Sequence, residues 1–148
     1  MSQVSTLLDS NIFVFAHQPA HPKHAIAFQL IARSVEGKES FAAAEQNLLE
    51  WYSVITSTRQ RIEPLSSADA TRALQNYYSS RLVLVRPTVQ TASLFQQLLV
   101  NRSTVIGKDV FDLYLVATAL SNGIDTILTD NTKDFAGIPG LTAINPFA

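Results

Sequence analysis

Short apolar runs of strand character alternate with longer segments of helical periodicity along almost the whole chain. The strand-like runs lie at residues 5–9, 40–43, 81–86, 125–129 and 141–144. The helix-like segments lie at residues 21–37, 44–58, 66–80, 87–100 and 109–123. Strands joined by crossover helices pair in parallel, and the helices then cover the faces of the sheet. This order therefore predicts an α/β fold with a mainly parallel central sheet and helices on both faces.

The composition is that of a globular protein, with 47% apolar and 16% charged residues in 148. A chain of this length predicts one domain, which we place at residues 1–148. No apolar run approaches the roughly 18 residues that span a bilayer, and the first residues do not resemble a signal peptide. We therefore expect a cytoplasmic protein with no membrane association. The absence of cysteine excludes disulfides and thiolate metal sites.

The net charge of −1 conceals an uneven distribution of charge along the chain. Residues 109–148 contain five Asp and one Lys, whereas residues 1–108 contain seven acidic and ten basic residues. A basic body with one acidic region suits a protein that attracts a polyanion and holds cations locally. Solvated charged surfaces often give the same distribution, so this observation is supporting only.

Polar residues follow two of the predicted strands. The run LLDSN sets Asp9 at the end of the first strand, and TILTDN ends another at Thr129, Asp130 and Asn131. A buried carboxylate is costly unless it is paired, hydrogen-bonded or bound to a cation. Sites in open parallel sheets form beyond the carboxyl ends of strands. If these two strands are neighbours, the polar residues form an oxygen-rich edge.

Asp112 is the single charge within VFDLYLVATAL, a helix so apolar that it should be buried on all sides. One interpretation makes Asp112 part of a polar site. The other makes it part of a helix cap, with Asp109 as N-cap and Asp112 at the third helical position. The sequence alone leaves both open.

Glu50 lies off the apolar face that Leu48, Tyr52 and Ile55 form on the helix at residues 44–58. Its neighbours one turn away include Gln46 and Asn47, which indicate a partly hydrated face. An ordinary solvated glutamate is therefore the alternative to a functional role.

Together these carboxylates form a set of hard oxygen donors without Cys or His. Such donors suit Mg²⁺ or Mn²⁺, which bind through few carboxylates and complete their shells with water and phosphate oxygens. Divalent ions of this kind support phosphodiester hydrolysis without a side-chain nucleophile. Acids held close together also repel one another unless a cation is present.

Four segments, LLDSNIF, LLEWYSVIT, VFDLYLVATAL and TILTDNTKDF, occur in this order from Leu7 onward. In this order and spacing they resemble the PIN domain, and in particular the toxin-like VapC-type ribonucleases. The resemblance extends to about Phe147. It implies a three-layer α/β/α fold and an endoribonuclease that depends on Mg²⁺ or Mn²⁺. It also implies an antitoxin that inserts a peptide into the site.

By position, the resemblance assigns four catalytic residues: Asp9, Glu50, Asp112 and Asn131. Many family members have Asp at the position of Asn131, and many toxin-like members have Asn. Asp130 or Asp134 is then the source of the missing charge, and we take Asp9, Glu50, Asp112 and Asp130 as the metal ligands. The supporting residues are Asn11, Thr129 and Asp134.

We expect RNA as the substrate, an antitoxin protein as a partner, and a homodimer. The main alternative is a PIN-fold RNA-binding or regulatory protein that has lost activity, for which Asn131 is the main support. A receiver-like signalling domain with a Mg²⁺ site at Asp9 is a second alternative. The segments around Glu50 and Asp112 argue against the receiver-like domain.

Three further groups of residues have two interpretations each. His17, His21 and His24 have the spacing of metal ligands on a helix, but Pro19 and Pro22 break that helix and favour a solvated loop. The aromatic residues are base-stacking candidates or parts of the core or a dimer surface: Trp51, Tyr52, Tyr77 and Tyr78. The arginines either follow an RNA backbone or are scattered over the surface: Arg59, Arg61, Arg72, Arg81 and Arg86.

Overall fold

The structure is a computed structural model, and it describes residues 4–59, 63–102 and 104–148. The strands are β1 (Thr6–Leu8), β2 (Phe41–Ala44), β3 (Val83–Val85), β4 (Thr126–Leu128) and β5 (Thr142–Ile144). The helices are α1 (Ser10–Ala16), α2 (His24–Val35), α3 (Glu45–Ile55), α4 (Ser67–Ser79), α5 (Thr91–Val100), α6 (Asp109–Ser121) and the 3₁₀ helix η1 (Thr132–Phe135). In this part of the chain, no helix has the length and apolar character needed to cross a membrane.

The five strands form one sheet in the order β3-β2-β1-β4-β5, and every neighbouring pair is parallel. The predicted parallel α/β sheet is therefore confirmed. β1 is the central strand, and its residues Thr6 to Leu8 pair in register with Thr126 to Leu128 of β4. After α6 the chain returns to the middle of the sheet, where β4 lies directly beside β1.

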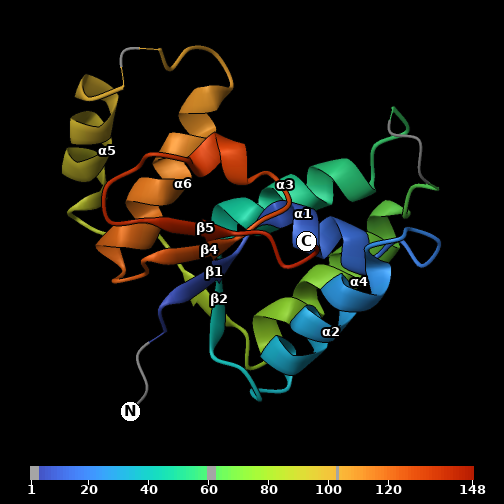
Figure 1. The fold of residues 1–148 in the computed structure, drawn as a ribbon. Coiled ribbons are helices and arrows are strands. Elements are labelled where there is room, and N and C mark those ends of the chain that lie inside the picture. Colours follow the sequence, from blue (N-terminus) through green and yellow to red (C-terminus); the bar gives the residue numbers. More distant parts are fainter. Residues whose placement is uncertain (1–3, 60–62, 103) are drawn as a thin grey trace.

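Helices cover both faces of the sheet and give three layers, as Figure 1 shows. Leu8 and Ala43 face a core that α1, α2, α3 and α4 complete. Leu7 and Ala42 face the other core, which α5, α6 and η1 complete. Successive strand residues point to opposite faces, so short runs of continuous apolar sequence can fill both cores.

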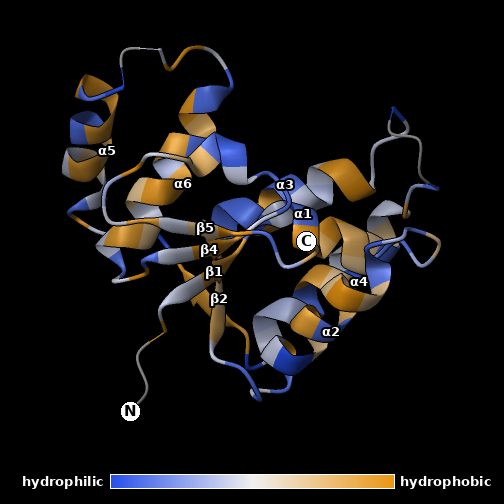
Figure 2. Ribbon diagram, in the orientation of Figure 1, coloured by the Kyte–Doolittle hydropathy of each residue, from blue (hydrophilic) through white to orange (hydrophobic). Residues whose placement is uncertain are grey.

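The helix α6 is buried on nearly all sides, as its sequence predicts. It packs against the sheet and against α5, and six of its residues are buried: Leu113, Leu115, Val116, Ala117, Thr118 and Ala119. Figure 2 shows hydrophobic residues over most of its length and along β2. Its two charged residues, Asp109 and Asp112, both lie in the first turn.

Two local expectations differ from the structure. The helix predicted to open at Pro87 begins at Thr91, because Thr88 exchanges hydrogen bonds with Gln90 and Thr91 and forms a turn there. The buried face of α3 contains Trp51 in place of Tyr52. The predicted face was therefore wrong at this one residue, because the Trp51 indole packs in the core that α1 and α4 share with α3.

Candidate active site

Asp9 lies immediately after β1, at the carboxyl edge of the sheet, and is 7% exposed. Because β1 and β4 are neighbours, Asp9 lies beside the fully buried Thr129. The Thr129 hydroxyl donates to Asp9 Oδ2 at 2.8 Å, and the Ser10 backbone N–H donates to Asp9 Oδ1 at 2.8 Å. Burial raises the pKa of Asp9, and these hydrogen bonds oppose the rise by favouring the ionised form. The predicted oxygen-rich edge therefore exists.

Ser10 joins Asp9 to Glu50. Its hydroxyl lies 3.3 Å from Asp9 Oδ1 and donates to Glu50 Oε2 at 2.7 Å. Ser10 begins α1 and Glu50 is on α3, so one hydroxyl links two helices that pack side by side. Sequence reasoning assigned Ser10 no role, although its position directly after Asp9 in DSN was a signal.

Asn47 holds the same carboxylate from the side of α3. Its Oδ1 accepts from the Ala44 backbone N–H at 2.9 Å, and its Nδ2 donates to Asp9 Oδ1 at 3.4 Å. Asn47 is fully buried, so the expectation of a hydrated face around it was wrong. A buried amide needs hydrogen-bond partners, and Asn47 finds them in the N-terminal turn of α3 and in Asp9.

Gln46 connects Glu50 to α6. Its Nε2 donates to Glu50 Oε1 at 2.9 Å and to the Phe111 carbonyl oxygen at 2.9 Å. Phe111 immediately precedes Asp112, so this contact fixes the first turn of α6 against the Glu50 carboxylate. Gln46 was also missed by sequence reasoning, although it lies one helical turn from Glu50.

Asp112 is half-buried, and no donor among the described residues hydrogen-bonds to its carboxylate. Burial first, and then the negative charges of Asp9, Asp134, Glu50 and Asp109, raise the pKa of Asp112 to about 7. The N-cap of α6 is Lys108, and its cap has no side-chain hydrogen bond. Asp109 is therefore not the N-cap and Asp112 does not complete a capping box, although Asp112 lies in the first turn of α6, where the helix dipole favours a carboxylate.

Asp134 is a further acid near Asp112, and both line one polar pocket. Asp134 lies in η1, and its charge acts on Asp112. Asn131 is exposed and precedes η1 as its N-cap, without a side-chain cap bond. Asp112 is thus the residue at which the charges of Asp9, Glu50 and Asp134, drawn from three other segments, act together.

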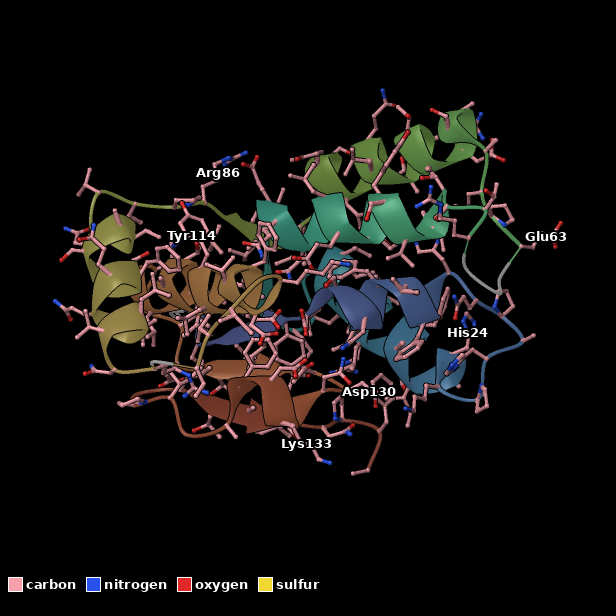
Figure 3. All side chains as sticks on the ribbon, turned by 90° about the horizontal axis from the view of Figure 1, so that it is seen from above. His24, Glu63, Arg86, Tyr114, Asp130 and Lys133 are labelled. Atoms are coloured by element: carbon pink, nitrogen blue, oxygen red, sulfur yellow. The ribbon has the colours of Figure 1, made fainter. Side chains whose placement is uncertain are left out.

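Asp130 has a different partner. Lys23 Nζ donates to both carboxylate oxygens of Asp130 at 2.7 Å, in an ion pair in which Asp130 is 19% exposed. Figure 3 shows Asp130 between the η1 segment and the N-terminal helices. Asp130 is not among the charges that raise the pKa of Asp9 or Asp112. A cation at Asp130 would have to compete with Lys23 for this carboxylate, and Asp130 as a metal ligand stays a prediction.

Asn11 supports the loop after β4. Its Nδ2 donates to Thr129 Oγ1 at 3.2 Å, and its Oδ1 accepts from the Asp130 backbone N–H at 3.4 Å. The Asn131 backbone N–H also donates to Thr129 Oγ1, at 3.1 Å. Asn11 and Thr129 thus lie where the expected supporting role places them, because together they hold the loop against Asp9.

Carboxylate oxygens are the donors that Mg²⁺ and Mn²⁺ prefer. Within residues 4–59, 63–102 and 104–148, however, the structure brings together no group of three or more His, Cys, Asp or Glu side chains that could hold a metal ion. An ion at this edge would therefore bind through one or two carboxylates and complete its shell with water and phosphate oxygens. The Asp112 carboxylate, which has no hydrogen-bond donor in the described part of the chain, and its acidic neighbours are groups whose repulsion a cation would relieve.

A small polar pocket of about 180 Å³ adjoins Asp112 on the side of η1. Arg102 and Lys133 line it together with Asp109, Asp112 and Asp134. Figure 3 shows Lys133 on η1. The carboxylates of Asp9, Glu50, Asp112 and Asp134 are called the acidic cluster below. Cations next to it were not predicted. They give this side of Asp112 the chemistry to hold a phosphate group.

Asp112→Asn should stabilise the metal-free protein at alkaline pH. A carboxyl whose pKa is raised in the folded state makes the fold lose stability as the pH rises from about 4 to about 7, and Asn cannot ionise. We expect a gain of about 1–2 kcal/mol at pH 8, limited by solvent screening of a half-buried group, and almost none at pH 4. The free energy of unfolding, measured by denaturant unfolding in EDTA at pH 4 and pH 8, tests this prediction.

The control for this prediction is Asp109→Asn, an exposed position in the same helical turn. It should change the free energy of unfolding by less than about 0.5 kcal/mol. A large loss of stability in Asp112→Asn at pH 8 would contradict the electrostatic account and restore a structural role for this carboxylate.

The histidines do not form a metal site. His17 Nε2 hydrogen-bonds to the Tyr77 hydroxyl at 2.7 Å, and its ring packs against Trp51. His21 stacks on Phe15, and its Nδ1 accepts from the Lys23 backbone N–H, whereas His24 Nδ1 contacts the Phe15 carbonyl oxygen. The predicted solvated loop holds only in part, because His17 is a half-buried cap of α1.

Trp51 and Tyr77 are core residues, with exposures of 0% and 7%, so neither can stack on a base. Tyr52 hydrogen-bonds to Ser67, and Tyr78 is exposed. Among the arginines, Arg72 pairs with Asp69 and Arg86 pairs with Glu45. Arg61 lies outside the described residues.

Comparison with known proteins is consistent with this geometry. Residues 6–141 match the PIN domain. The chain is 27% identical over 124 residues to the VapC ribonuclease Mb2897 of Mycobacterium bovis, which covers 83% of this chain and 84% of that protein.

Two solved structures share the fold. VapBC2 of Rickettsia felis, solved with a promoter DNA fragment, superposes with a TM-score of 0.65 at 20% identity, covering 96% of this chain and 98% of that one. VapC20 of Mycobacterium tuberculosis, described as a Sarcin-Ricin loop cleaving toxin, gives 0.64 at 16% identity, covering 93% and 98%. With the family match over most of its length and the same fold, the chain belongs to the PIN domain family.

Proposed function

We propose that this protein is an endoribonuclease of the VapC toxin type that depends on Mg²⁺ or Mn²⁺. The observation that carries the proposal is the half-buried Asp112 carboxylate, which has no hydrogen-bond donor in the described residues and faces other carboxylates. The name of the Mycobacterium bovis relative, a ribonuclease, supports the choice of RNA as substrate. The candidate metal ligands in this proposal are Asp9, Glu50, Asp112 and Asp134, of which one or two would bind a given ion directly while water completes its shell.

The chain's own residues fix the two best-ordered carboxylates. Thr129, Ser10 and Asn47 hold the two oxygens of Asp9, while Ser10 and Gln46 hold those of Glu50. These contacts set the orientation of both acids before substrate arrives, which reduces the reorganisation needed for reaction. A bound divalent ion supplies positive charge for the phosphate oxygens and lowers the pKa of water.

Arg102 and Lys133 have a separate task in this proposal. They line the polar pocket beside Asp112, where their charges favour a phosphate of the RNA backbone over the repulsion of the nearby acids. Arg102 Nη1 also donates to the Ala136 carbonyl oxygen at 3.2 Å, so its guanidinium is already held at the rim. A held cation loses less conformational freedom when it binds a phosphate.

Purified protein should cleave single-stranded RNA in Mg²⁺ or Mn²⁺, and EDTA should stop the cleavage. The measurement is the fragment pattern of a panel of cellular RNAs, followed by readdition of excess metal to the EDTA-treated sample. The protein must first be freed of any co-purifying antitoxin. Wild-type protein that yields no metal-dependent fragments would leave the alternative of a PIN-fold RNA-binding protein without activity.

In our proposal, Asp134 supplies the charge that Asn131 lacks, which weakens the support that Asn131 gives to that alternative. The electrostatic effect of Asp134 on Asp112 supports this assignment. An inactive protein would also have no need for a carboxylate whose ionisation is disfavoured. The acidic cluster therefore favours the active enzyme.

An antitoxin partner follows from the same assignment. The Rickettsia felis neighbour is a VapBC complex, and this supports a paired antitoxin for the present chain. The single domain over residues 1–148 and the homodimer stay predictions. Co-expression with the product of the adjacent reading frame, followed by purification through one partner, tests the pairing.

A further inference from the structure

A second, more apolar pocket lies on the other side of Asp112 from the polar pocket. It has a volume of about 440 Å³ and is lined by Gln46, Leu49, Glu50, Lys108, Phe111 and Asp112. Two of the candidate metal ligands therefore form part of its wall. We call it the Phe111 pocket.

Two large apolar side chains are exposed at the Phe111 pocket. Leu49 of α3 is 67% exposed, and Phe111 of α6 is 60% exposed. Exposed aromatic residues next to charged groups often mark binding sites. The Gln46 bond to the Phe111 carbonyl oxygen ties this turn of α6 to Glu50, so the aromatic ring projects from backbone that is anchored to the acidic cluster.

The two pockets differ in the part of a nucleotide that they suit. The polar pocket contains Arg102 and Lys133 and suits a phosphate, whereas the Phe111 pocket offers an aromatic face and an aliphatic side chain. In a phosphodiester substrate, bases flank each phosphate within one nucleotide. A phosphate placed at the carboxylates therefore brings a neighbouring base within reach of the Phe111 pocket.

We propose that the Phe111 pocket binds one unpaired base of single-stranded RNA next to the phosphate at the acidic cluster, with the ring of Phe111 as its stacking platform. This proposal rests on the proposed function for the position of the phosphate. The base must leave its stack to reach the ring, so the site selects unpaired nucleotides. Lys108 supplies a cation for the backbone on this side.

The carboxylates in the pocket wall favour RNA over a second copy of this chain as the occupant. A protein surface that sealed the pocket would bury Glu50 and Asp112 away from water, which is costly without paired cations. A nucleotide leaves the carboxylates accessible to water and to cations that accompany its phosphates. Only part of the pocket, the side with Leu49 and Phe111, then needs to be covered.

Binding of mixed-sequence single-stranded RNA in EDTA, measured by fluorescence anisotropy, tests the base site independently of cleavage. Phe111→Ala should weaken binding by about 5- to 150-fold, the range for one base stacked on an aromatic ring. Phe111→Trp should bind the RNA about as tightly as wild type. Phe111→Leu should bind it as weakly as Phe111→Ala, because Leu has no aromatic face. The matched control is Phe28→Ala on α2, which is 56% exposed and lies outside both pockets near Asp112, and it should bind as wild type.

A second measurement locates the base. Where wild type cleaves an RNA, an abasic nucleotide beside the cut phosphate should weaken binding as much as Phe111→Ala does. Combining the abasic RNA with Phe111→Ala should give little further loss, because both remove the same contact. Additive losses would show that the base and the ring do not meet.

The outcomes separate this proposal from the nuclease assignment. Cleavage by wild type with RNA affinity that does not depend on Phe111 overturns the base site and leaves the nuclease standing. RNA binding that depends on Phe111, without any cleavage, overturns the nuclease assignment and leaves the base site standing. Loss of dimer on sedimentation in Phe111→Ala, with Phe111→Leu still dimeric and binding RNA normally, would assign the pocket to a second copy. Failure of wild type to bind any single-stranded RNA overturns both.

Discussion

Asp9→Asn should lower RNA cleavage by about 10³-fold, while RNA affinity stays the same or rises. Asp9 is the most buried acid of the cluster, and three polar neighbours hold its two oxygens. In our proposal it acts only through the bound cation, so its loss removes the charge that makes the site reactive. It also removes a negative charge that repels phosphate, which is why affinity should not fall.

The measurement combines single-turnover cleavage with anisotropy on the same RNA. Asp125→Asn is the matched control, because Asp125 is an exposed acid that precedes β4, at the opposite edge of the sheet from Asp9. It should leave both quantities within about twofold of wild type. Cleavage by Asp9→Asn close to the wild-type rate would rule out Asp9 as a metal ligand. If RNA affinity in Asp9→Asn fell by the same factor as the cleavage rate, Asp9 would be a substrate-binding residue instead.

Asp134→Asn should lower cleavage by about 10²-fold, whereas Asp130→Asn should lower it by less than about tenfold. Asp134 adds negative charge at Asp112, so it can share a cation with that carboxylate. The charge of Asp130 is already compensated by Lys23. Loss of this partly exposed ion pair should act only by loosening the loop that holds Thr129.

Metal binding gives a second measurement that does not require activity. The Mg²⁺ concentration that half-saturates thermal stabilisation should rise about tenfold in Asp134→Asn, which corresponds to about 1.4 kcal/mol of lost binding energy. It should not change in Asp130→Asn or Asn131→Ala. The reverse pattern, with the large effect at Asn131 and none at Asp134, would return the fourth position to the residue that the family resemblance assigns.

If both predictions hold, the site consists of two pairs of carboxylates that differ in how they are held. Hydrogen bonds hold the carboxylates of Asp9 and Glu50, whereas no described residue donates a hydrogen bond to the carboxylate of Asp112 or Asp134. The first pair is then the fixed part of the site. The second pair is the part whose repulsion depends on pH and on the presence of a cation, so removal of metal should be felt mainly at Asp112.

Some features of the protein were determined by the sequence because they depend on local periodicity. Alternating strand and helix segments predict a parallel sheet, and the all-round apolar character of VFDLYLVATAL predicts a buried α6. The polar residues at Asp9 and Thr129 follow the ends of their strands, so a parallel sheet brings them to one edge as soon as the strands are neighbours. Each of these follows from a pattern within one segment.

Other features required the tertiary structure, because they depend on how segments distant in sequence meet. Periodicity indicates which residues share a helix face, but not the rotation of that face toward its neighbours. Asn47 was therefore expected on a partly hydrated face, whereas it lies buried against Asp9. The sequence could not choose between Asp130 and Asp134. Lys23, 107 residues away, pairs with Asp130, whereas the charge of Asp134 acts on Asp112, and these two contacts are the reason that we propose Asp134.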